Sequence, residues 1–312
     1  LDTVFDAATP VRLAAHDDGL IVGPGICDDA RGLAALLTLA RVLRQALLTF
    51  SHPLLFVATV GEEGAGDLRG VRHLFSPAGA LAAGCAGFIS LDGAGVEPIV
   101  NQGPGARRWR VTMSGPGGHS WSDAGVPNPM HGLSRAIAAL DAHPRPPGTT
   151  LSVGRWGGGT SVNAIPTEAW CEIEVRALDE RRLDTLATTV EDSIRAHAAT
   201  VSDAGSGARL AVSLRSLGVR PAGATAPDAA LVGAALTATR ALGVKPRLAA
   251  ASTDSNLPMS LGIPAVTLGA GGEGGAAHTE HEWYRNTDGP LGVARALLTL
   301  LLADLHSRHA VW

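Results

Sequence analysis

The sequence predicts an α/β fold with a small α+β domain inserted into it. Near both ends of the chain, apolar runs with strand character alternate with patterns of helical period, which is typical of an α/β domain. Between them, residues 108–214 read strand, helix, strand, strand, helix, strand, the split βαβ pattern of a ferredoxin-like domain. We therefore expect a discontinuous domain over residues 1–104 and 216–312 and an inserted domain over residues 105–215.

The first segment of the discontinuous domain should begin with a hairpin over residues 10–25. Leucines at helical spacing then predict a helix from Leu33 to Leu48. The apolar run Leu54–Val60 predicts a buried strand, and Ala86–Leu91 predicts a second one. A short helix over residues 68–75 should connect these two strands.

The rest of the chain is assigned in the same way, from alternating or apolar runs for strands and 3.6-residue spacing for helices. Inserted-domain strands are expected at residues 108–113, 150–156, 169–177 and 209–214, with helices at residues 130–140 and 181–197. The return segment should hold helices at residues 228–242 and 290–306 and a strand at residues 263–268. The loop at residues 269–275 is too rich in glycine to pack as an element, so we expect it to move or to approach a ligand.

Two adjacent carboxylates, Glu62 and Glu63, follow the apolar run at residues 54–60 in the sequence Gly-Glu-Glu-Gly. Like charges this close raise one another's pKa. A metal ion relieves the repulsion, because one carboxylate binds the ion and the other is left as a base beside the water on the metal. The alternative is an ordinary acidic turn.

Acidic residues also stand at two other element ends. Asp28 and Asp29 precede the helix at residues 33–48, and Asp92 follows the strand at residues 86–91. Helix capping accounts for one of the two aspartates, which leaves the other as a candidate bridging ligand. The carboxyl ends of strands form the sites of open α/β sheets, and converging oxygens suit a divalent cation, although chance placement is the competing interpretation.

A pair of histidines, His278 and His281, lies near the end of the chain in the sequence Ala-His-Thr-Glu-His-Glu-Trp. A lone histidine after a loop is usually structural. Two histidines within four residues and next to acids make a metal ligand as good an interpretation as a structural role.

Composition excludes several classes of protein. With 312 residues, 46% of them hydrophobic, the chain is globular and long enough for two domains. The net charge of −4 and the single basic cluster at residues 107–110 argue against nucleic-acid binding. Three widely spaced cysteines argue against a disulfide framework and a four-cysteine zinc site. The apolar run at residues 296–303 is too short to span a membrane, so we expect no membrane partner.

Taken in chain order, these motifs resemble those of the M20 family of metallopeptidases. That family includes peptidase T-like aminopeptidases, glutamate carboxypeptidases and N-acyl-amino-acid deacylases. The resemblance covers essentially the whole chain, and six motifs in order are far more specific than any one of them. They are Leu-Asp-Thr-Val from Leu1, Gly-Pro-Gly-Ile-Cys-Asp-Asp ending at Asp29, Gly-Glu-Glu-Gly from Gly61, Leu-Asp-Gly ending at Gly93, Gly-Gly-His-Ser-Trp ending at Trp121 and Ala-His-Thr-Glu-His-Glu-Trp ending at Trp283.

The resemblance implies a zinc-peptidase-like α/β catalytic domain that holds two Zn²⁺ ions, with Co²⁺ or Mn²⁺ as alternatives. Asp28 would bridge the two ions. Glu63 and Asp92 would each complete one side, and His278 would be a further ligand. The peptide bond between Asp28 and Asp29 is often cis in this family.

The resemblance also implies roles outside the ligand set. Glu62 would be the general base, and Asp2 would orient a histidine ligand. The inserted domain would serve as a lid and dimerisation domain in a homodimer built edge to edge. From it, His119 would reach into the partner subunit's active site to stabilise the oxyanion, while Asn163 and Arg176 would contact substrate.

The sequence departs from the family pattern at its start. The first family motif is His-x-Asp, and its histidine would stand immediately before Leu1. We therefore expect either a fragment of a full enzyme or a metal-deficient form. The fragment is favoured, because a chain that starts inside a sheet would expose strand edges and apolar surface.

The function expected from these residues is hydrolysis of amide bonds in short peptides. The first alternative is an N-acyl-amino-acid deacylase, which would differ mainly in lid residues. The second is a non-catalytic fragment or remnant of the same scaffold, which would bind metal weakly. A simple calcium- or magnesium-binding module is disfavoured by His278 and by the absence of a ligand-dense loop. No targeting segment is visible, so cytoplasmic localisation is the default expectation.

Overall fold

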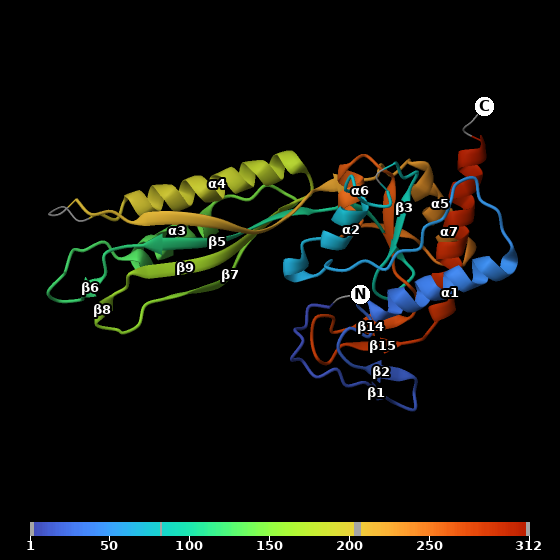
Figure 1. Cartoon of the computed structure of the whole chain (residues 1–312), viewed down its shortest axis with the longest axis horizontal. Coiled ribbons are helices and arrows are strands. Elements are labelled where there is room, and N and C mark those ends of the chain that lie inside the picture. The colour runs from blue at the N-terminus through green and yellow to red at the C-terminus, as the bar shows by residue number, and fades with distance from the viewer. Residues whose placement is uncertain (1–2, 82, 203–206, 310–312) are drawn as a thin grey trace. The chain divides into compact units, whose positions relative to one another are not determined.

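A computed structural model describes residues 3–81, 83–202 and 207–309, and the chain divides into two compact units. The discontinuous unit comprises Leu1–Gly103 and Gly223–Trp312, and the inserted unit comprises Pro104–Ala222 (Figure 1). The second crossing between them lies later than the boundary predicted after residue 215. The reason is that the last strand of the inserted unit continues to Arg220.

The main sheet of the discontinuous unit has the strand order β11-β4-β13-β3, with β12 along the other side of β4. Its pairings are mixed, since β13 is parallel to β3 and antiparallel to β4. The parallel pair places the ends of β3 and β13 at one edge of the sheet. The strands are β3 Phe88–Leu91, β4 Pro98–Gly103, β11 Gly223–Ala224, β12 Arg247–Ala250 and β13 Ala265–Leu268.

Helices cover this sheet through apolar side chains at helical spacing. Leu231, Val232 and Ala235 of α5 pack against buried residues of β4 and β13, and α7 packs against both α1 and α5. The unit's α-helices are α1 Ala30–Ala46, α2 Arg69–Leu74, α5 Ala230–Ala241, α6 Asn256–Ser260 and α7 Gly289–His309, with a 3-10 turn at Gly64–Gly66.

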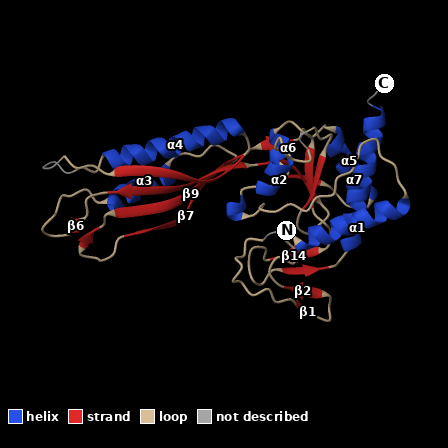
Figure 2. Cartoon of the chain, viewed as in Figure 1, coloured by secondary structure: helices blue, strands red, loops and turns tan. Residues whose placement is uncertain are grey.

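A second sheet joins the two ends of the discontinuous unit, with the order β1-β2-β15-β14 (Figure 2). The predicted hairpin is confirmed as β1 and β2, and β15 pairs antiparallel with β2. This pairing brings the segment that precedes α1 against the segment that follows His278. The strands are β1 Ala14–Ala15, β2 Leu20–Val22, β14 Glu273–Gly275 and β15 Trp283–Arg285.

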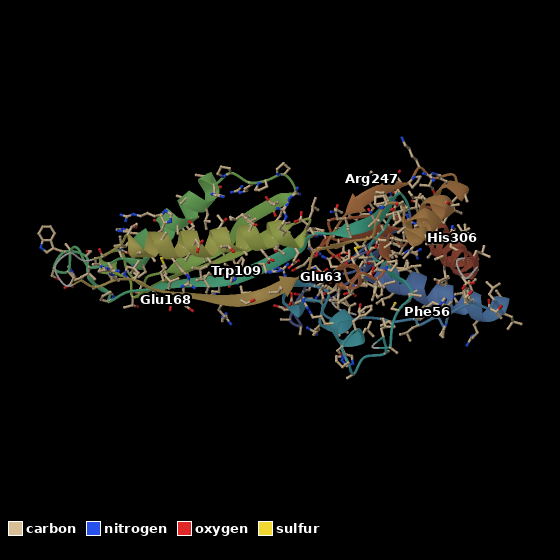
Figure 3. The ribbon with its side chains drawn as sticks, turned by 90° about the horizontal axis from the view of Figure 1, so that it is seen from above. Phe56, Glu63, Trp109, Glu168, Arg247 and His306 are labelled. Atoms are coloured by element: carbon tan, nitrogen blue, oxygen red, sulfur yellow. The ribbon has the colours of Figure 1, made fainter. Side chains whose placement is uncertain are left out.

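The predicted strand at Leu54–Val60 is wrong. This segment forms no strand with any described residue, and Leu55 is exposed. Phe56, labelled in Figure 3, is exposed as well. Apolar composition predicts a strand only where a partner supplies the hydrogen bonds, and pairing is a tertiary property. Strands β4 and β12, conversely, were not predicted from the sequence, because they are short and carry weak periodicity.

The inserted unit has an antiparallel sheet of order β10-β5-β9-β7 with α3 and α4 packed on one face. In chain order the elements are β5, α3, β7, β9, α4 and β10, which is the predicted ferredoxin-like arrangement. A two-stranded ribbon of β6 and β8 extends from it. The bounds are β5 Gly105–Ser114, β6 Gly118–His119, α3 Pro129–Ala142, β7 Thr149–Gly158, β8 Ala164–Ile165, β9 Glu168–Ala177, α4 Glu180–Ala199 and β10 Ala211–Arg220.

The glycine-rich loop after β13 packs closely against backbone. Gly95 donates its N–H to the carbonyl of Gly272 at 3.1 Å, and Gly271 donates to Gly95 at 3.1 Å. A Cβ on Gly271 would collide with the carbonyl of Gly289. Gly271 and Gly272 also have positive φ, 88° and 79°. Close packing therefore explains these glycines. The prediction that the loop forms no element is wrong at its end, because Glu273–Gly275 forms β14.

Helix α7 carries a buried arginine. Arg295 is fully buried, and its guanidinium donates to the carbonyls of Gly269 at 2.7 Å, Pro98 at 3.2 Å and Val96. Burial lowers the pKa of this guanidinium to about 10. By length and composition alone, residues 289–306 of α7 are long and apolar enough to cross a membrane. The apolar run at residues 296–303 noted in the sequence is a shorter part of this helix. In the structure, Arg295 ties the helix to the loops that follow β3 and β13.

Candidate metal centre

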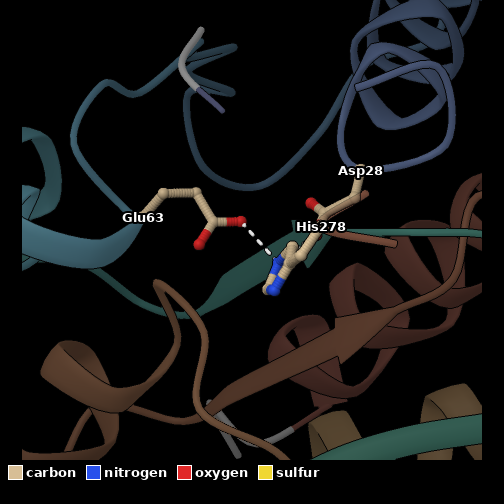
Figure 4. Close-up of side chains that lie close together, drawn as sticks. All are labelled: Asp28, Glu63 and His278. Atoms are coloured by element: carbon tan, nitrogen blue, oxygen red, sulfur yellow. Dashed lines mark hydrogen bonds and ion pairs between the residues drawn. The ribbon is translucent and has the colours of Figure 1, made fainter. Parts of the chain in front are cut away.

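Three side chains from distant parts of the chain meet in the discontinuous unit (Figure 4). His278 Nε2 lies 3.1 Å from Asp28 Oδ2 and 3.2 Å from Glu63 Oε1. The three atoms lie within 4.8 Å of one another. The Glu63 and Asp28 side chains are 15% and 22% exposed and that of His278 is 56% exposed, so the cluster is open on one side.

Asp28 and Asp29, at the start of α1, have different hydrogen-bond partners. Asp29 is the N-cap, and its Oδ1 accepts the N–H of Gly32 at 3.0 Å and that of Gly93 at 3.2 Å. Asp28 faces His278 instead. The peptide bond between the two aspartates is cis, as the family resemblance implies. The structure thus assigns capping to one aspartate and leaves the other for the cluster.

Glu63 lies in a tight turn. Gly61 has a φ of +73°, and Gly66 donates its N–H to the carbonyl of Glu63 at 2.8 Å. A Cβ on Gly66 would collide with the backbone of Gly61, so the turn needs glycine at both positions. Glu62 precedes Glu63 in this turn and is partly buried.

His278 lies in a turn with an unusual backbone. Its φ is +65°, a left-handed conformation that non-glycine residues seldom adopt. The turn is closed by Thr279, whose hydroxyl donates to the carbonyl of Ala276 at 2.7 Å, and by Glu282, whose N–H donates to the carbonyl of Thr279 at 3.1 Å. Local hydrogen bonds therefore maintain the strained position of the histidine.

Asp92 follows β3 directly, and its N–H donates to the carbonyl of Leu268 at 3.0 Å. It is outside the three-atom cluster but within electrostatic range of it. Burial raises the pKa of Asp92 well above its ordinary value, and the neighbouring carboxylates raise it further. Those carboxylates are Asp29, Asp28, Glu62 and Glu63. The three acidic element ends that the sequence singled out therefore converge.

Carboxyl groups dominate the electrostatics of the cluster. Burial raises the pKa of Asp29 to about 7, and the charge of Asp28 adds to that shift. Burial lowers the pKa of His278, but the carboxylates of Glu63 and Asp28 outweigh it, so the net shift is upward. Protons and cations are both attracted to such a cluster.

The donor set fits a divalent metal. Zinc binds histidine nitrogen and carboxylate oxygen at about 2.0–2.2 Å, which places tetrahedral ligand atoms about 3.4 Å apart. The observed separations of 3.1 Å and 3.2 Å from His278 Nε2 come close to that spacing. A mixed set of one nitrogen and several oxygens is also what zinc, cobalt and manganese accept.

The ribbon of the inserted unit brings together two of the residues predicted from the resemblance. His119 pairs with Ala164 across the ribbon, and the carbonyl of Asn163 accepts the N–H of Ser120 at 2.9 Å. His119 Nδ1 accepts the N–H of Trp121 at 3.2 Å. In the neutral imidazole the proton therefore resides on Nε2, so His119 can donate a hydrogen bond from Nε2.

Arg176 is not part of that group. It lies near the other end of β9 and forms a two-point ion pair with Glu174, at 2.7 Å and 3.1 Å. Arg108 binds the same carboxylate at 2.6 Å. The predicted contact of Arg176 with a substrate carboxylate therefore stays a prediction, and Asp2 lies outside the described residues.

Two residues that position this region were not predicted from the sequence. Glu282 accepts three backbone N–H groups from the loop that holds Asp28. Arg31 donates to the carbonyls of Ala270, at 2.6 Å and 3.0 Å, and Gly289, at 2.8 Å. Glu282 lies within one of the family motifs and Arg31 lies two residues after another, but their partners are more than 200 residues away, so no sequence pattern indicates these contacts.

Comparison with solved structures shows the same fold in several peptidases. A tripeptidase from Staphylococcus aureus has 24% identity, covers 97% of this chain and 79% of its own, and gives a TM-score of 0.80. Aminopeptidase PepT from Bacillus cereus has 22% identity, with 97% and 78% coverage and a TM-score of 0.76. The YXEP protein of Bacillus subtilis, described as a dinuclear metal binding peptidase, has 19% identity, with 88% and 71% coverage and a TM-score of 0.64.

Identities this low show a shared fold, and the family follows from the sequence itself. No curated protein matches the chain in sequence. Residues 1–302, however, match the family profile of peptidase family M20/M25/M40. The match spans both units and every motif that entered the resemblance. The chain therefore belongs to peptidase family M20/M25/M40, an enzyme family of peptidases and amidohydrolases.

Proposed function

We propose that the chain is a metal-dependent hydrolase that cleaves amide bonds of short peptides. The observation that carries the proposal is the cluster of Asp28, Glu63 and His278, whose donor atoms lie within 4.8 Å of one another. Membership of a peptidase family supports it. The tripeptidase and aminopeptidase named among the similar structures favour peptides as the substrate class.

In this proposal the discontinuous unit is the catalytic domain. Asp28, Glu63, Asp92 and His278 would hold two Zn²⁺ ions, with Co²⁺ or Mn²⁺ as alternatives. When bound, such ions polarise a carbonyl oxygen and lower the pKa of water. The raised pKa of Asp92 is consistent with this role, because a carboxylate surrounded by like charges is stabilised by a cation.

Glu62 is the proposed general base. It is adjacent to Glu63 in the same turn, and its charge contributes to the raised pKa of Asp92. It would accept a proton from water as the water oxygen attacks the amide carbon. It would then deliver that proton to the nitrogen as the C–N bond breaks, which yields a carboxylic acid and an amine.

The inserted unit is the proposed lid. The Nε2–H of His119 is suited to donate to the oxyanion that develops on the carbonyl oxygen. Asn163, on the same ribbon, and Arg176 would contact substrate. Because Arg176 already binds Glu174, a substrate carboxylate would have to share or replace that partner.

We also propose that the inserted unit forms a homodimer and that His119 serves the partner's site. Strand β7 is an edge of its sheet. A groove of about 450 Å³ beside it, between β7 and α3, is lined by apolar side chains such as Val153 and Trp156 and by polar ones such as Asp141 and Arg145. Trp156 is 62% exposed. A second copy paired along β7 would cover both the strand edge and this groove.

The test is hydrolysis of a panel of dipeptides, tripeptides and N-acetyl amino acids by the zinc-loaded protein. Glu62→Gln should lower kcat by about 10²- to 10⁴-fold, because general-base catalysis is lost while the shape of the side chain is kept. Zinc content should stay at the wild-type level. Faster cleavage of N-acetyl amino acids than of peptides would indicate a deacylase, and undiminished activity in Glu62→Gln would remove Glu62 from the mechanism.

A further inference from the structure

Glu282 is a buried carboxylate that binds the backbone beside the metal cluster. It is 1% exposed. Its Oε1 accepts the N–H groups of Cys27 and Asp28, both at 2.7 Å, and its Oε2 accepts that of Gly25 at 3.1 Å. Three charge-assisted hydrogen bonds compensate for burying the charge, and they fix the loop that carries Asp28.

The sequence produces this arrangement through one strand pairing. Trp283 of β15 lies opposite Val22 of β2, so the residue before Trp283 faces the chain that leaves β2. Accordingly, the carbonyl of Glu282 accepts the N–H of Gly23 at 2.7 Å. Gly25 has a φ of +72°, which lets the loop curl so that its N–H groups point at one carboxylate.

The same residue is coupled to His278. Its N–H donates to the carbonyl of Thr279 at 3.1 Å, which closes the turn that follows the histidine. Glu282 therefore touches both segments that must stay in register for Asp28 Oδ2 and His278 Nε2 to remain 3.1 Å apart. Its carboxylate holds one segment and its backbone belongs to the other.

We propose that Glu282 is a positioning residue of the metal centre, and that its carboxylate sets the position of Asp28 relative to His278. This inference rests on the proposed function, because it assigns Glu282 a role toward the ions that the cluster would hold. Loss of a hydrogen bond that orients a metal ligand commonly weakens metal binding by about 10- to 100-fold. Glu282 acts through the backbone of a ligand, so the same sensitivity is expected.

The test compares Glu282→Gln and Glu282→Ala with Glu280→Gln. Glu280 is exposed and lies in the same segment, so it controls for loss of one nearby negative charge. The glutamine variant keeps the shape but turns an N–H₂ group toward a backbone donor, and we expect about a 10-fold loss of zinc affinity. The alanine variant removes all three side-chain bonds, and we expect about a 100-fold loss. Glu280→Gln should bind zinc as the wild type does.

Two further readouts separate positioning from simple stabilisation. Hydrogen exchange at the amides of Cys27 and Asp28 should accelerate in Glu282→Gln, because these N–H groups donate to Glu282. For peptide hydrolysis at saturating zinc, kcat should fall while KM stays constant, since Glu282 touches no substrate in this mechanism.

Wild-type zinc affinity in Glu282→Gln would overturn the inference and leave the proposed function intact. The inference also fails if the glutamine variant loses folding stability but each folded chain still binds zinc normally. A wild-type chain that binds no zinc and cleaves no amide would overturn the proposed function and, with it, the metal role of Glu282. Should Glu282→Ala fail to fold, the glutamine variant and the exchange measurement decide the question.

Discussion

Neighbouring residues of the same type do different work at this site. Asp28 and Asp29 are adjacent, yet Asp28 meets His278 at 3.1 Å and Asp29 accepts the N–H groups of Gly32 and Gly93. Asp29 thus joins the start of α1 to the loop that follows Asp92. Composition alone could not separate the two roles, because both aspartates stand where a helix begins.

The role of Asp29 leads to a stability prediction. Asp29→Ala should have a free energy of unfolding about 1 kcal/mol lower than Asp29→Asn, because asparagine keeps an oxygen that can accept the N–H groups of Gly32 and Gly93 and alanine does not. The measurement is urea unfolding of both variants after EDTA treatment. Neither variant is charged at position 29, so the comparison leaves out the charged carboxylate, which opposes folding because burial raises its pKa to about 7. Asp17→Ala, at an exposed turn, should change stability by less than about 0.5 kcal/mol. Equal stability of Asp29→Asn and Asp29→Ala would contradict the assignment of Asp29 as the cap.

At the residue scale, the sequence predicted the side chains that meet but not those that hold them. Asp28, Glu63 and His278 were predicted from motifs that are contiguous in the chain. Glu282 could not be, because its partners are about 255 residues away and are backbone groups, which leave no sequence signature. Only the pairing of β15 with β2 reveals them.

Helices α1 and α5 each contain a glycine, and the two glycines differ in whether a side chain would fit. In α1, a Cβ on Gly32 would overlap the carboxylate of Asp29, so the cap requires the absence of a side chain there. In α5, a Cβ on Gly233 would meet nothing within 4 Å. Helix propensity favours alanine over glycine by about 1 kcal/mol at either position. The contacts of the added Cβ therefore decide whether the substitution raises or lowers the free energy of unfolding.

Alanine at these two positions should therefore act in opposite directions. Gly233→Ala should raise the free energy of unfolding by about 0.5–1 kcal/mol. Gly32→Ala should lower it, because displacing Asp29 costs more than the propensity gains. Urea unfolding of both variants without metal gives the comparison. A stabilised Gly32→Ala variant would show that the Asp29 cap is dispensable.

Among the elements, helices and the inserted sheet were predicted well, while the segment at residues 54–60 was not. The apolar pattern there is that of a buried strand, yet Leu55 is 56% exposed and no strand among the described residues pairs with the segment. An apolar pattern indicates which side chains of a segment could be buried. Whether it pairs depends on a partner elsewhere, which a local pattern cannot supply.

At the scale of the whole molecule, the chain is two compact units of different construction. The inserted unit has its own core, formed by α3, α4 and the four-stranded sheet. Its ends are adjacent, because Arg220 near the end pairs with Ala106 near the start. Such an insertion can be removed with little disturbance of either part, which is how inserted domains are generally tolerated.

The inserted unit should therefore fold alone. A fragment of residues 104–222 is expected to show cooperative thermal unfolding with helix and strand content like that in the full chain. Circular dichroism of the fragment against temperature makes the measurement. Lack of a cooperative transition would show that the discontinuous unit contributes to its stability.

The topology of the discontinuous unit also explains why the site was partly predictable. The pairing of β2 with β15 brings the segments of Asp28 and His278 together, and Asp92 follows β3, which is parallel to β13. Each of these segments carries a motif at its turn. Motif order was enough to indicate the peptidase family, which the family profile confirms. The distances that make Asp28, Glu63 and His278 one cluster required the fold.

The most direct test of the metal centre is the affinity for zinc of the wild-type chain and of His278→Ala, measured by competition with a chromophoric chelator. The exposed Glu280→Gln variant, which lies two residues away, serves as the matched control. We predict tight binding by the wild type and by Glu280→Gln, and a loss of at least about 100-fold in His278→Ala, because a ligand itself is removed. Wild-type affinity in His278→Ala would contradict the assignment of Asp28, Glu63 and His278 as the metal centre.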